Sequence, residues 1–120
     1  MKNKYYEIPI LNNEYWVYVC IGKDYEELSR KLLRHFGDKY DENIDPETFK
    51  NKRGRILKKN SFIPYIFVNL NYCKTKNLFY ATLAHEACHA IDEIFNMIGD
   101  NNRDELFAHS VSAVIRGVNY

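Results

Sequence analysis

The chain has 120 residues, 46% of them hydrophobic and 28% charged, a composition typical of one globular domain and unlike that of a disordered tail. Lys and Arg number 17 against 16 for Asp and Glu, so the net charge of +1 provides no global attraction to nucleic acid or an anionic membrane. Three widely spaced cysteines favour a reducing compartment over a disulfide framework. The N-terminus has no apolar signal segment, and no apolar run is long enough to cross a bilayer. We therefore expect one cytoplasmic domain over residues 1–120.

The first half of the chain predicts strands. Residues 14–21 are aromatic and β-branched and precede a Gly22-Lys23-Asp24 turn, and residues 5–10 could pair with them. Residues 55–57 could begin another strand, and residues 61–70 resemble a strand more strongly. Since Pro64 has no N–H for a ladder, we expect residues 61–70 at a sheet edge.

Three helices are expected. Asp24 and Glu27 match a capping box, and apolar residues at helical spacing then run to Gly37, before a polar loop over residues 38–47. The strongest helical pattern covers residues 78–98 and stops at Gly99. Asp104 can cap a last helix with an apolar stripe of Phe107, Val111, Val114 and Val118. Strands gathered early and helices late predict an α+β fold, with a small, mainly antiparallel sheet packed against the helices.

The long helix contains His85-Glu86-Ala87-Cys88-His89, the pattern H-E-x-x-H. Two histidines four residues apart lie about one turn apart on one helical face, so both imidazoles can bind one metal ion. Zn²⁺ suits such nitrogen and oxygen donors, and it lowers the pKa of a coordinated water towards neutrality. Glu86 would then act as general base and pass the proton to the leaving amine. The motif thus predicts zinc-dependent peptide hydrolysis.

A helical wheel places the two histidines in one polar sector together with Leu78, Thr82, Asp92 and Asn96. The opposite sector contains Ala84, Ala87, Ile91, Ile94 and Ile98. The histidines should therefore avoid the core, whereas Cys88 is expected to pack with the apolar stripe. Asp92 could hydrogen-bond a ligand histidine or be an exposed carboxylate, and Cys73 could approach the site from the preceding loop.

The third metal ligand must come from outside the motif, and Glu105 is the first choice. Glu105 shares a polar stripe on the last helix with His109, Ser112 and Arg116. A straight helix to Ile98 would put His89 about 13 Å along the axis from the point where the chain leaves it. Glu105 reaches the metal only if residues 99–104 run back beside the helix. With a tight turn, His109 becomes the rival ligand.

Residues 80–90 (YATLAHEACHA) and 104–108 (DELFA) resemble the small zinc metallopeptidases encoded by bacteriophages, of the HExxH-then-Glu, gluzincin-like type. The resemblance covers about residues 75–117. It implies a minimal zincin-like fold in a host cytoplasm, with His85, His89 and Glu105 as zinc ligands and Glu86 as general base. That group often has Tyr where this chain has His109, which could stabilise the oxyanion, act as an alternative ligand or be solvated.

Residues 50–59 contain six basic residues, which could contact phosphates, but a solvated turn is the simpler interpretation because no aromatic residues are interleaved. The prediction is therefore a zinc metallopeptidase that acts on a peptide or a protein loop. One could also picture an extended substrate adding to the edge formed by residues 61–70. The alternatives are a hydrolase of a non-peptide amide, a catalytically silent zinc protein that binds a partner, and a nucleic-acid module that uses residues 50–59.

Overall fold

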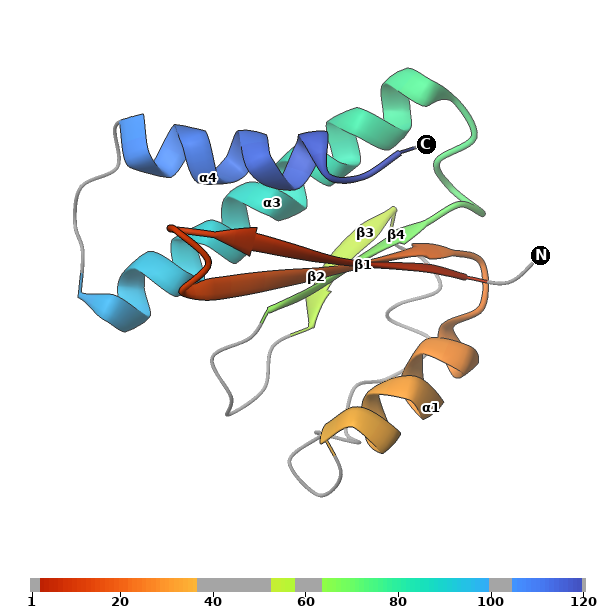
Figure 1. The fold of residues 1–120 in the computed structure, drawn as a ribbon. Helices are drawn as coiled ribbons and strands as arrows, with labels where there is room; N and C mark the ends of the chain where they lie inside the picture. Colours follow the sequence, from red (N-terminus) through yellow and green to blue (C-terminus); the bar gives the residue numbers. More distant parts are fainter. Residues whose placement is uncertain (1–2, 37–52, 58–63, 100–104, 120) are drawn as a thin grey trace.

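The computed structural model describes residues 3–36, 53–57, 64–99 and 105–119. These residues form three layers, with α1 on one face of a sheet and α3 and α4 on the other (Figure 1). The α+β class expected from the sequence is confirmed. No helix in these ranges has an apolar stretch that would suffice to span a membrane.

The sheet has four strands among the described residues, β1 Lys4–Ile10, β2 Tyr15–Gly22, β3 Gly54–Leu57 and β4 Tyr65–Asn69. Their order is β1-β2-β4-β3. The outer pairs β1·β2 and β3·β4 are antiparallel, whereas the inner pair β2·β4 is parallel, so the sheet is mixed. Parallel strands need a crossover connection, and α1 (Tyr25–Phe36) lies between β2 and β4 in the chain.

The prediction that residues 61–70 form an edge strand is wrong. β4 lies between β2 and β3, and all five of its residues are buried. Pro64 directly precedes this strand, so its missing N–H is not needed in the ladder, and its carbonyl oxygen accepts a hydrogen bond from Tyr18 N (3.1 Å). Among the described strands, β3 forms the edge on this side of the sheet.

Alternating side chains of the strands build two cores. Val17, Val19 and Ile21 face α3 and α4 together with Ile66 and Val68 of β4. On the other face, Cys20 and Phe67 pack against Tyr25 and Leu28 of α1. Because both faces of β2 and β4 are covered by helices, these strands are apolar along most of their length.

Caps fix the ends of α3 (Lys76–Ile98). Thr75 Oγ1 accepts a hydrogen bond from Leu78 N (3.1 Å). Gly99 ends the helix in the left-handed conformation (φ 74°), as predicted. The expected cap of α1 is also present, since Asp24 Oδ1 accepts a hydrogen bond from Glu27 N (3.0 Å).

The last helix, α4, spans Glu105–Arg116. Three residues of its predicted apolar stripe face the core, with Val114 buried and Phe107 and Val111 packed against it; Val118 is also buried but follows the end of the helix. Ser110 is also buried, and its hydroxyl donates to the Leu106 carbonyl oxygen (2.9 Å). The predicted stop at Gly37, the loop at 38–47 and the cap at Asp104 lie outside the described residues, as do 50–52, 58 and 59 of the basic stretch.

Candidate metal centre

His85 and His89 lie side by side on the solvent face of α3. Their ring centroids are 4.8 Å apart, with an angle of 77° between the ring planes. Both side chains are exposed, which confirms the prediction that they avoid the core. The four-residue spacing produces this proximity because it corresponds to about one helical turn.

Glu86 points in a different direction from the two histidines. It is about 100° around the helix from His85, and only 9% of its surface is exposed. A Cβ built on Gly54 of β3 would lie 3.0 Å from Glu86 Cγ, so the carboxylate side chain lies where α3 meets the edge strand. The helix therefore turns its imidazoles to solvent and its carboxylate towards the junction with β3.

Two predictions around the motif are wrong. Cys88 is exposed rather than packed in the core. Thr82, which the helical wheel assigned to the polar sector, is buried with 8% exposure. The core face of α3 is thus rotated towards β3. Its buried residues are Phe79, Thr82, Leu83, Glu86, Ala87, Ala90, Ile91, Ile94 and Phe95.

Cys73, in the loop before α3, lies beside Thr82, and its predicted approach to the metal site remains a prediction. Its Sγ lies 3.4 Å from Thr82 Oγ1 and 3.6 Å from the carbonyl oxygen of Arg53. Sequence reasoning missed the roles of Thr82 and Gly54 beside Glu86. The four-residue spacing of Thr82 and Glu86 was a usable signal for Thr82, but nothing in the local sequence links Gly54 to α3.

The start of α4 lies beyond the histidine pair along α3. Phe107 packs edge-on against Phe95 with a centroid distance of 5.4 Å, and Phe95 lies about 9 Å along the α3 axis beyond His89. Glu105 and His109 are both exposed. Within the described ranges, no three His, Cys, Asp or Glu side chains lie close enough together to hold a metal ion. Glu105 as third ligand, and His109 as its rival, remain predictions.

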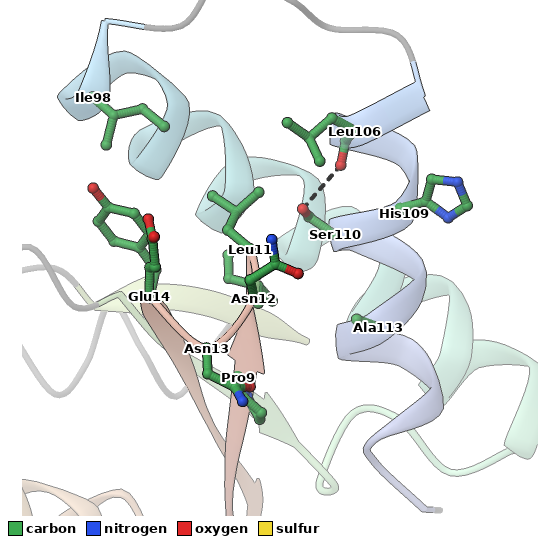
Figure 2. A pocket seen from close by; sticks show the side chains of 12 residues that line it. Pro9, Leu11, Asn12, Asn13, Glu14, Ile98, Leu106, His109, Ser110 and Ala113 are labelled. Carbon is green, nitrogen blue, oxygen red and sulfur yellow. Dashed lines mark hydrogen bonds between the residues drawn. The ribbon is translucent and has the colours of Figure 1, made fainter.

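His109 belongs to the wall of a separate cavity of about 520 Å³ between α4 and the turn that joins β1 to β2. Figure 2 shows the imidazole projecting from the side of α4 away from that turn, while Leu106 and Ser110 face it. Three consecutive residues of the turn, Leu11, Asn12 and Asn13, have positive φ angles (52°, 58° and 66°).

Asp92 is half-buried on α3, and its Oδ2 accepts a hydrogen bond from Asn96 Nδ2 (3.4 Å). This bond holds the carboxylate along the helix, in the sector that also contains the histidines. Its predicted hydrogen bond to a ligand histidine remains a prediction.

Comparison with known proteins gives no match to a family model, a curated protein or a solved structure. The chemistry of the donors must therefore be judged from the site itself. Two imidazoles one turn apart fit two positions of a Zn²⁺ site. The carboxylate next in sequence is within the same helical turn but is held against the sheet edge.

Proposed function

We propose that this protein is a zinc-dependent metallopeptidase, in which His85 and His89 bind the metal and Glu86 is the general base. The observation that carries the proposal is the arrangement on α3: two exposed imidazoles with ring centroids 4.8 Å apart, next to a buried glutamate. Zinc, when bound, would polarise the scissile carbonyl and make a water molecule more acidic. Glu86 would take the proton from the attacking water and return it to the leaving nitrogen.

The role requires the Glu86 side chain, which points towards β3, to turn to the water beside the histidine pair. Because Glu86 lies between α3 and β3 and is only 9% exposed, few water molecules reach it. A peptide in extended conformation that paired with the edge strand β3 would run past the same junction. The proposed edge for substrate pairing is therefore β3, and not the strand at residues 61–70 where the sequence placed it.

The proposal is tested first by zinc stoichiometry of protein purified without a metal-chelating tag. We expect one zinc per chain, and its loss in His85→Ala and in His89→Ala. Cys88→Ala is the matched control, because this exposed side chain lies between the two histidines in sequence and should leave zinc content unchanged. Glu105→Ala and His109→Ala then test whether either of these residues completes the metal site.

The second measurement is hydrolysis of a fluorescence-quenched peptide library by the zinc-loaded protein. Glu86→Gln should keep the zinc and lose about 10²- to 10⁴-fold in rate, since it removes the base but preserves the shape of the side chain. Absence of zinc or any other divalent metal after reconstitution would refute the proposal. Zinc bound without hydrolysis of any peptide would favour the catalytically silent, partner-binding alternative.

A further inference from the structure

Gly54 occupies the position on β3 that faces Glu86. Its register partner on β4 is Val68, which belongs to the core beneath α3, so position 54 faces the same helix. A Cβ at this position would lie 3.0 Å from Glu86 Cγ and 2.6 Å from Thr82 Cγ2. Carbon atoms in contact normally stay about 3.5 to 4.0 Å apart. The close approach of strand and helix at this point therefore requires glycine.

The strand side of this contact is held in place by its neighbours. The carbonyl oxygen of Arg53, the residue before Gly54, accepts a hydrogen bond from Asn69 N (2.8 Å). The same oxygen lies 3.6 Å from Cys73 Sγ. Because Asn69 and Cys73 are both buried, the start of β3 cannot easily move away from α3 to accommodate a side chain at position 54.

On the helix side of this contact, the Thr82 side chain is held in place and the Glu86 side chain is freer to move. Thr82 is buried, its Oγ1 lies 3.4 Å from Cys73 Sγ, and a β-branched residue in a helix has restricted χ1 freedom. Glu86 has a longer side chain with more rotatable bonds. A methyl group added at position 54 would therefore overlap the Thr82 methyl, which has little freedom to move, and would also displace the Glu86 side chain, which has more.

We propose that Gly54 is a positioning residue for Glu86. The missing side chain at position 54 leaves the space in which the glutamate lies, and Thr82, held by Cys73, bounds that space on the helix. This inference rests on the proposed function, because it assigns Gly54 to the setting of the general base. His85 and His89 are exposed and lie outside this contact, so metal binding does not depend on Gly54.

A thermal-unfolding cycle tests the geometry without any activity. Gly54→Ala should lower the unfolding midpoint by several degrees, and part of this loss should disappear in a Glu86→Ala background, where Cγ is absent and only the overlap with Thr82 remains. Gly117→Ala is the control: its Cβ would overlap Ile8 on β1, at the opposite edge of the sheet, so its midpoint loss should be the same in both backgrounds. Equal losses for Gly54→Ala in the two backgrounds would overturn the inference.

The catalytic meaning is tested on zinc-loaded protein. Gly54→Ala should keep the zinc stoichiometry and KM but lose about 100-fold in kcat, the scale expected when a reacting group is misplaced by about 1 Å. Thr82→Ser removes the nearer methyl and keeps the hydroxyl beside Cys73, so Gly54→Ala/Thr82→Ser should recover part of kcat. An active wild type with unchanged kcat in Gly54→Ala would overturn the inference alone. An inactive wild type would overturn the proposed function, and with it this role of Gly54.

Discussion

At the level of single residues, Gly22 and Asn3 fix the point where β2 turns into α1. Asn3 is buried, its Nδ2 donates to the Asp24 carbonyl oxygen (2.7 Å), and its Oδ1 accepts from Asp24 N (3.3 Å). A Cβ on Gly22 would overlap the Asn3 amide. We expect Gly22→Ala to cost about 1 to 3 kcal/mol in unfolding free energy, because Asn3 must move and both hydrogen bonds weaken.

Urea unfolding measures this loss, and the same substitution in an Asn3→Ser protein shows whether the overlap with Asn3 causes it. In an Asn3→Ser protein the terminal amide is absent, so Gly22→Ala should cost less there than in the wild type. An equal cost in both backgrounds would show that the glycine matters for another reason, such as the backbone itself.

Single residues of α3 also show which features of the candidate metal centre a helical wheel could predict. Thr82 and Cys88 are each about 60° from His85 around α3, on opposite sides. The sequence analysis assigned Thr82 to the polar sector and Cys88 to the apolar stripe, yet Thr82 is buried and Cys88 is exposed. Thr82 is buried because β3 covers its side of α3. Gly54 is 28 residues away in the chain, so this contact leaves no periodic signal in the sequence of the helix. The exposure of the histidine pair was predictable because it lies between these two sides of α3.

At the level of elements, the Thr75 cap stabilises the N-terminal end of α3, the helix that carries the motif. Thr75→Ala removes the acceptor for Leu78 N (3.1 Å), so we expect a loss of about 1 kcal/mol in unfolding free energy. Thr75→Ser keeps the hydroxyl and should remain close to the wild type. Chemical denaturation of the three proteins makes the comparison. Equal losses in Thr75→Ala and Thr75→Ser would argue that packing of the threonine methyl, and not capping, stabilises this end.

Element types were predictable where local chemistry specifies them, as in α3 with its periodic pattern and Gly99 stop. Which elements pack next to each other was less predictable. Pro64 suggested an edge strand, but the sheet inserts β4 between two strands because the proline precedes the ladder. The path of α4 depends on how it packs, and the Phe95–Phe107 contact sets its start beyond the histidine pair along α3. Neither arrangement has a local sequence signal.

At the level of the whole molecule, the candidate metal centre and one of the two cores lie on different sides of the sheet. The histidines project from α3 into solvent, while Cys20, Tyr65 and Phe67 are packed beneath α1 on the far face. Aromatic stacking adds to that second core, since the rings of Tyr18 and Tyr65 have centroids 4.7 Å apart. Variants of the two exposed histidines should therefore change metal binding without unfolding the protein.

The buried core under α1 predicts a loss of stability at high pH. Burial raises the pKa of Cys20 from its ordinary value of 9.0 to about 12, and burial also raises the pKa of Tyr5 and Tyr65. The folded state thus keeps a proton on Cys20 that the unfolded chain releases above pH 9, so stability is full below pH 9 and falls between pH 9 and 12. At pH 10.5 the Cys20 contribution to this loss is about 2 kcal/mol. Urea unfolding at pH 8 and 10.5 should show a smaller decrease in Cys20→Ala than in the wild type, with Cys88→Ala matching the wild type. Equal decreases in wild type and Cys20→Ala would place the pH sensitivity elsewhere in the molecule.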